Sequence, residues 1–142
     1  MKLSRRDLAV LFPALAANAQ PQQKQSQPLP SKVYHDGQIP YDGNAQKKGR
    51  RFFFGPNRSG FNVELHETML GPGVQAHDPH KHVHEEIVIL AEGTLESNLE
   101  GRRETVEAGS VIFFASNEMH NVRNVGSTTC RYYVIELRGD EA

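Results

Sequence analysis

Histidines are concentrated in one stretch of this 142-residue sequence, where five of the seven lie between His66 and His84. Within that stretch His80 and His82 stand two residues apart, and Glu86 follows shortly after them. Residues two apart in a strand project from the same face, so two imidazoles and one carboxylate could converge on a single ion. Neutral imidazole and carboxylate suit iron, manganese, zinc, cobalt or nickel. The spacing therefore predicts a site for one divalent transition metal.

A second segment supplies a further candidate, because the apolar run 111–114 leads on to His120. Another histidine, His77, precedes an Asp-Pro pair in a predicted loop. His77 has two interpretations, an exposed loop residue and a proton shuttle near neutral pH. We keep His77 and Glu86 as the candidates for catalytic acid–base work.

Two other histidines, His66 and His84, have no fixed place in this pattern. The chain is expected to bend near His84, so this side chain either faces solvent or supports a ligand from behind. His66 lies on the alternating segment 61–70, and its side chain reaches either the pocket or the outside. Sequence alone leaves both alternatives open, because it does not set the register of that strand.

Short apolar or alternating runs separated by Gly, Pro and Asn make up the chain from residue 50 onward. Such punctuation predicts an all-β sandwich or barrel and excludes a helix bundle. The runs 94–100 and 102–107, joined near Gly101, predict a hairpin. The expected strands are 51–54, 61–70, 86–90, 94–100, 103–107, 111–114, 120–124 and 131–137.

Two motifs in this sequence resemble those of the cupin superfamily. The first is a pair of histidines, then a glutamate and a glycine at fixed spacing, matched here by His80, His82, Glu86 and Gly93. The second is a glycine, a histidine and an asparagine, matched by Gly109, His120 and Asn124. The sequence departs from the motifs at three points: Gly73 lies one residue early, and Ala115 and Asn117 replace a proline and a glycine.

The resemblance implies a double-stranded β-helix, the cupin or jelly-roll barrel, extending over residues 50–138. It also implies a metal held by the four side chains of His80, His82, Glu86 and His120. Iron or manganese is favoured, and zinc, nickel or cobalt is compatible with the same ligands. Four protein ligands on a metal that favours six leave two positions open for a small molecule.

The first 19 residues have the layout of an export signal, with a basic start, a short apolar run and a small-x-small end. Residues 4–8 resemble a twin-arginine signal; an ordinary secretion signal is the alternative. We therefore expect a periplasmic or secreted protein with no stable membrane span after processing. Residues 20–33 predict a flexible linker, and residues 34–49 an N-terminal arm in front of the barrel.

Charge and composition exclude several classes of protein. With 16 Lys and Arg against 17 Asp and Glu, the chain lacks the basic excess that nucleic-acid binding requires. The single cysteine, Cys130, excludes a disulfide framework and any multi-cysteine metal site. Cupins resembling this chain are commonly dimers, so a homodimer that uses residues 31–54 is expected.

The sequence leaves two classes of function open. One is an exported metal-dependent enzyme, either an oxygenase or a lyase or isomerase, acting on a small oxygenated organic molecule. The other is a non-catalytic periplasmic protein that binds a metal or a small ligand. The motifs predict the fold and the metal site more sharply than the reaction, because one fold carries many functions.

Overall fold

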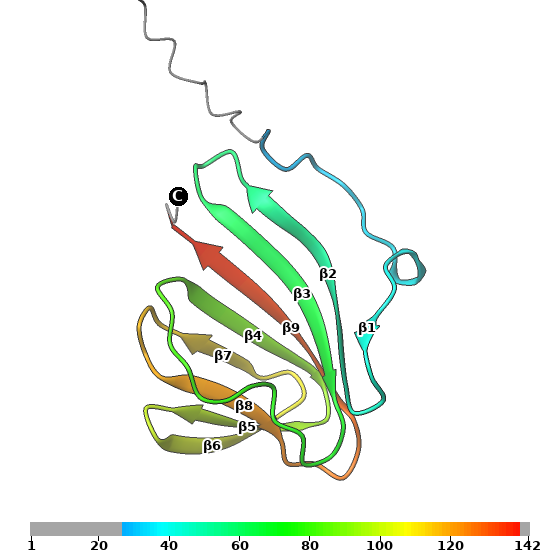
Figure 1. Cartoon of the computed structure of the whole chain (residues 1–142), viewed down its shortest axis with the longest axis vertical. Coiled ribbons are helices and arrows are strands. Elements are labelled where there is room, and N and C mark those ends of the chain that lie inside the picture. Colours follow the sequence, from blue (N-terminus) through cyan, green and yellow to red (C-terminus); the bar gives the residue numbers. More distant parts are fainter. Residues whose placement is uncertain (1–26, 140–142) are drawn as a thin grey trace, which may run out of the picture.

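Antiparallel strands in two sheets make up almost all of the regular structure in the computed structural model, which describes residues 27–139. The larger sheet has the strand order β1-β2-β3-β9-β4-β7, and the smaller has the order β6-β5-β8 (Figure 1). The bounds are β1 Asp42–Gly43, β2 Lys47–Pro56, β3 Asn62–Leu70, β4 Glu85–Glu92, β5 Thr94–Leu99, β6 Arg102–Glu107, β7 Val111–Phe114, β8 His120–Asn124 and β9 Cys130–Arg138, with one 3-10 turn at Asp36–Gln38.

The inner faces of β3, β4 and β9 change character along their length. On β9 the inward residues pass from Cys130 and Tyr132 through Val134 to Glu136, all buried. On β4 they pass from apolar Leu90 to ionisable Glu86 in the same way. One end of the barrel is therefore filled by an apolar core, and the other carries titratable groups. The core residues are Leu70, Ala76, Val88, Leu90, Leu95, Phe114, Val122, Cys130, Tyr132 and Val134.

The connection from β3 to β4, residues 71–84, runs beside β8 and extends the smaller sheet (Figure 1). Single bridges join Gln75 to Arg123 and His80 to His120. Between the two bridges, four residues of the connection (76–79) lie opposite two of β8 (121–122), so the connection bulges there. Pro79 lies in this bulge, where its lack of a backbone N–H costs no ladder hydrogen bond.

The turn between β4 and β5 requires a glycine for two reasons. Gly93 has a φ of +86°, in the left-handed region that favours glycine. A Cβ at this position would lie 2.7 Å from the Cβ of Cys130, inside van der Waals contact. This close approach lets the start of β9 pass under the turn.

The all-β jelly-roll prediction is confirmed, and all eight expected strands are present. The hairpin over Gly101 is also present, as β5 and β6. Regular structure begins earlier than expected, because β1 and the first residues of β2 precede residue 50. The strand geometry assumed for His80 and His82 is wrong, since both lie in the connection before β4, which begins at Glu85.

The N-terminal part of the described chain lies along β2. Tyr34 packs against Phe53, with ring centroids 5.5 Å apart, and the backbone N–H of Leu29 donates to the carbonyl of Pro56. The expected export signal, residues 1–19, lies outside the described residues. Among residues 27–139 no helix is both long and apolar enough to cross a bilayer.

Candidate metal centre

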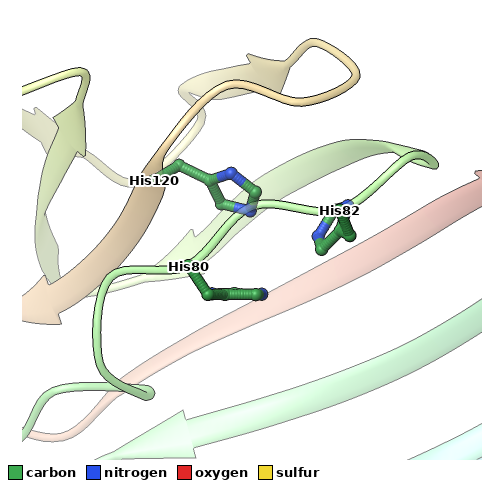
Figure 2. Close-up of side chains that lie close together, drawn as sticks. All are labelled: His80, His82 and His120. Atoms are coloured by element: carbon green, nitrogen blue, oxygen red, sulfur yellow. The ribbon is translucent and has the colours of Figure 1, made fainter.

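Backbone pairing brings two of the expected ligands together at the end of the smaller sheet. The N–H of His80 donates to the carbonyl of His120 at 3.1 Å, and the N–H of His120 donates back at 2.9 Å. Two residues that exchange both hydrogen bonds project their side chains from the same face. The ring centroids of the pair lie 4.8 Å apart. Figure 2 shows both rings, with that of His82, turned toward one region between the strands.

The other two expected ligands are His82, on the segment that leads into β4, and Glu86, on β4 itself. The His82 ring lies 5.1 Å from that of His80 and 4.8 Å from that of His120, centroid to centroid. The Glu86 carboxylate, on β4, lies 3.0 Å from Nε2 of His120 and 3.7 Å from Nε2 of His82. One nitrogen from each of the three histidines falls within 4.8 Å of the others, a spacing that could hold an ion.

Hydrogen bonds to backbone carbonyls orient two of these imidazoles. Nδ1 of His82 lies 2.8 Å from the carbonyl oxygen of His84, and Nδ1 of His120 lies 2.8 Å from that of Glu118. A carbonyl only accepts, so each Nδ1 carries a proton. Nε2 of His82 then keeps its lone pair, whereas Nε2 of His120, 3.0 Å from the Glu86 carboxylate, donates a proton to it until a metal takes that place. This is the arrangement that supports metal-bound histidines in proteins.

Buried nitrogens without partners also fit a metal at this place. Among residues 27–139, Nε2 of His82 and Nδ1 of His80 are buried and have no hydrogen-bond partner. A buried polar atom left unpaired costs free energy, which metal coordination would recover. The donor set of three imidazoles and one carboxylate is one that divalent transition metals accept. The residues present therefore fit a bound metal.

The turn before His120 ties the two ligand segments to each other. Asn117, where the motif usually has glycine, adopts a φ of 63°, which asparagine tolerates better than most residues. Its backbone N–H donates to the carbonyl of His82 at 2.8 Å. Beneath the site, the Phe114 ring stacks on His120 at a centroid distance of 4.3 Å. These contacts fix both histidines before any metal is present.

The charges of Glu86 and His120 depend on each other. Burial acts to raise the pKa of the Glu86 carboxyl, but the hydrogen bond from His120 and the charges of nearby histidines outweigh it and lower the pKa. Burial acts to lower the pKa of His120, but hydrogen bonds to Glu86 and to the Glu118 carbonyl outweigh it and raise the pKa. Without a metal, the two groups thus favour an ion pair.

Burial has the opposite net effect on two other histidines. It lowers the pKa of His80, helped by neighbouring His77, and it lowers the pKa of His84, helped by neighbouring His82. Both imidazoles are therefore neutral near pH 7. Neutral imidazole is the form that binds metals or accepts a proton.

The four expected ligands border a cavity of about 390 Å³ between the two sheets. The apolar part of its lining is supplied by residues of the core, including Val88, Phe114 and Tyr132. The polar part is His66, Thr68, His77, His80, His82, His84, Glu86, His120, Asn121, Glu136, Lys47 and Arg138. Such a volume admits a small organic molecule beside the metal.

The structure decides where the remaining histidines lie. His84 does not face solvent, because its side chain is only 10% exposed and its ring stacks on His82 at a centroid distance of 3.5 Å. The alternative of a supporting residue behind a ligand agrees with this position. His66 lines the cavity, and together with Glu64 it also lines a second hollow beside β2. His77 is exposed, lines the cavity and lies edge-on to His80, with centroids 4.0 Å apart.

The sequence analysis did not predict two buried carboxylates, Glu64 and Glu136, that contact histidines of the cavity. Glu64 accepts from Nδ1 of His66 at 3.2 Å, and Glu136 lies 3.5 Å from Nε2 of His84. Both belong to inward-facing positions of alternating strands. The only signal in the sequence was that alternation, and it became usable once the register of β3 and β9 was known.

Comparison with known proteins identifies this architecture. The family model of the cupin domain matches residues 66–136, half of the chain. Comparison with curated proteins finds no match.

Several solved structures share the fold. KdgF from Halomonas sp. has a TM-score of 0.65 at 16% identity, covering 79% of this chain and 98% of its own. The polyketide cyclase RemF from Streptomyces resistomycificus has a TM-score of 0.62 at 22% identity, covering 79% and 87%. A predicted oxalate decarboxylase from Thermotoga maritima has a TM-score of 0.56 at 21% identity, covering 75% and 99%. At these identities the likeness shows the fold alone.

Proposed function

The chain belongs to the cupin family, and we propose that its cavity is the active site of a metal-dependent enzyme that acts on a small oxygenated organic molecule. The observation that carries the proposal is the convergence of His80, His82, His120 and Glu86 beside a cavity of about 390 Å³. Enzymes among the structural neighbours are in keeping with a catalytic role.

In this proposal His80, His82, His120 and Glu86 would hold the metal. Iron or manganese is the favoured ion, with zinc, nickel or cobalt also suited to the ligands. The bound metal would supply Lewis-acid polarisation of a substrate oxygen. The chain's own contribution is to orient the His82 and His120 rings through Nδ1, so that Nε2 faces the site, and to line the floor with apolar Phe114.

Redox-neutral lyase or isomerase chemistry suits the cavity better than oxygenation. Proton acceptors and donors surround the candidate metal centre on several elements, among them His66, His77, His84 and Glu136. A lyase or isomerase needs such groups to move protons, whereas an oxygenase needs mainly two open metal positions and a substrate. Glu86 is positioned either to remain a ligand or to act as a base.

An anaerobic assay tests the proposal. Metal-free protein would be reloaded with Mn²⁺, Zn²⁺ or Fe²⁺ and incubated in D₂O with hydroxy acids, keto acids, diketones and sugars, and NMR would follow product formation and deuterium uptake. Turnover that needs a metal and no O₂ supports the lyase or isomerase assignment. In a parallel aerobic assay, turnover only with Fe²⁺ and O₂ would identify an oxygenase instead. Saturable binding without turnover would contradict the enzyme and support a non-catalytic binding protein.

We also propose export to the periplasm or beyond the cell, because the first 19 residues have the layout of an export signal. N-terminal sequencing of protein expressed in its native host tests this. A chain that begins near residue 20 in the exported fraction supports the proposal, and a chain that retains Met1 in the cytoplasm contradicts it.

A homodimer is the assembly that we propose, and an apolar outer face on the larger sheet supports an interface there in place of the expected one at residues 31–54. Val111 and Phe113 of β7 are 62% and 52% exposed, and Ile89, which pairs with Val111, is 36% exposed. Leu137, on β9 of the same sheet, is 37% exposed. Apolar side chains gathered on one sheet face favour association. Light scattering should give twice the mass of the processed chain, and Phe113→Glu should give the single mass.

A further inference from the structure

Three glutamates lie side by side on the inner face of the larger sheet. Glu64 pairs in register with Glu136, and Glu136 pairs in turn with Glu86, so the row crosses β3, β9 and β4. Like charges directly opposite each other destabilise a sheet, and burial increases the cost. Each carboxylate therefore needs its own cation. His120 is the cationic partner of Glu86, and an arginine is the partner of Glu64 and of Glu136.

The other two glutamates, Glu64 and Glu136, each contact one arginine and one histidine. Glu64 Oε1 accepts from Nε of Arg51 at 3.0 Å and from Nδ1 of His66 at 3.2 Å. Glu136 Oε2 accepts from Nε of Arg138 at 2.8 Å and lies 3.5 Å from His84. Both carboxylates are thus set between an arginine and a histidine.

This pairing decides between two uses of the cluster formed by Glu64, His66 and Glu136. Their ligand atoms lie within 4.8 Å of one another, so geometry alone would allow a second metal ion. The two carboxylates are already neutralised by Arg51 and Arg138, and a dication would add repulsion from both guanidinium groups. Charge therefore disfavours a second metal and leaves a role for the imidazole.

The orientation of His66 is that of a base held by a carboxylate. Its Nδ1 faces the Glu64 carboxylate, so Nδ1 carries the proton and Nε2 keeps a lone pair. The side chain is 26% exposed and lines the same cavity as the candidate metal ligands. It comes from the larger sheet, whereas His80 and His120 come from the smaller one. A substrate between them would have the metal on one side and an imidazole on the other.

We propose that His66, oriented by Glu64, is the residue that exchanges a proton with the substrate in this pocket. The inference rests on the proposed function. Nε2 takes a proton from an O–H or C–H bond of the substrate, and the electron pair of that bond stays on the substrate oxygen or carbon. The imidazolium later returns the proton to another atom of the substrate, so the step is redox-neutral and needs no oxidant. Glu64 is a positioning residue, which fixes the tautomer.

Charged groups on three strands lie around His66. Glu64 lies on the same strand and Glu136 lies on β9, and the ligand atoms of the three residues lie within 4.8 Å of one another. Arg51 pairs in register with His66 from β2 and is bonded to Glu64. Val134, in register on β9, is apolar.

The tautomer of His66 gives a test that needs no substrate. In zinc-loaded protein labelled with ¹⁵N-histidine, NMR should show the proton of His66 on Nδ1. Replacing Glu64 by Leu should move the proton to Nε2, the form favoured by free histidine in water. If NMR of the wild-type protein finds the proton of His66 on Nε2, the proposal is refuted, whether or not a substrate is known.

Kinetics with a substrate found in the anaerobic assay give the second test. His66→Asn should lower kcat by about 10²- to 10⁴-fold with little change in KM, while one metal per chain is retained. Glu64→Gln should lower kcat by about 10- to 100-fold. The control is His35→Asn, an exposed histidine outside the cavity, which should behave as wild type.

The outcomes separate this inference from the function on which it rests. Unchanged kcat in His66→Asn would refute the proton-transfer role while leaving the metal-dependent enzyme intact. Two metals in wild type and one in the variant would show that the cluster is a second metal site, and would also refute it. A wild type without turnover would refute the proposed function, and the NMR result would still decide whether Glu64 holds His66 in the proposed tautomer.

Discussion

Removing His120 from metal-free protein should expose the energetic cost of the buried Glu86 carboxylate. The side chains are 1% and 11% exposed, and Nε2 lies 3.0 Å from Oε2. Taking away one member of a buried ion pair typically costs about 3–5 kcal/mol, because the remaining charge stays buried without its hydrogen-bonded partner. His120→Leu should therefore lower the free energy of unfolding by roughly that amount near pH 5.5. The double variant with Glu86→Leu should recover part of the loss.

The double-mutant cycle isolates the pair from the packing changes. We expect a coupling energy of about 2 kcal/mol, within the range found for residues in direct contact. Urea unfolding in EDTA, followed by far-ultraviolet circular dichroism, is the suitable assay, since the chain has no tryptophan. Glu104→Gln on the exposed face of β6 is the control for loss of a carboxylate, and it should change stability little.

The pH dependence of this coupling follows from the two pKa directions. The pKa of His120 is raised above 6.5, so its contribution is complete below pH 6.5 and is lost as the pH rises through the folded value. The pKa of Glu86 is lowered below 4.5, so its contribution is complete above pH 4.5 and is lost as the pH falls through the folded value. Coupling should be largest between pH 4.5 and 6.5. Equal coupling at pH 5.5 and 9 would refute the reasoning.

Two further predictions concern the framework that holds the site. Asn124 is fully buried and makes three hydrogen bonds, donating to the carbonyls of Leu70 and Thr128 and accepting from Gly126. Asn124→Ala should cost about 3 kcal/mol in urea unfolding, and a cost below about 1 kcal/mol would contradict this hydrogen-bonding role. Gly93→Ala should lower the thermal midpoint and the yield of folded protein, because of the positive φ and the approach to β9; an unchanged midpoint would contradict the account of that turn.

The strands could be predicted from sequence because Gly, Pro and Asn punctuate them and each run is short. The motif spacing also picked out the four side chains that the structure brings together at His80, His82, Glu86 and His120. Sequence reasoning assumed strand spacing for His80 and His82, whereas in the structure a single bridge to β8 aligns His80 within an irregular connection.

The positions of the β3 residues at the cavity could not be predicted from the sequence, for a physical reason. The sides taken by His66 and Glu64 depend on the register of β3 against β2 and β9, which is set by contacts between residues far apart in the chain. The position of His84 depends on how its ring stacks on His82, and no alternation predicts a stacking contact. Local patterns thus predicted the elements, and pairing between strands decided the composition of the pocket.

The metal content of purified protein tests the central claim most directly. Mass spectrometry of wild type, of His82→Ala and of the control His35→Ala should find close to one equivalent of a divalent transition metal per chain in wild type and control. The variant His82→Ala should lose it, because His82 supplies a buried, unpaired Nε2 at the centre of the site. Wild-type protein without metal after native expression, or a variant that keeps its full equivalent, would contradict the assignment of this centre.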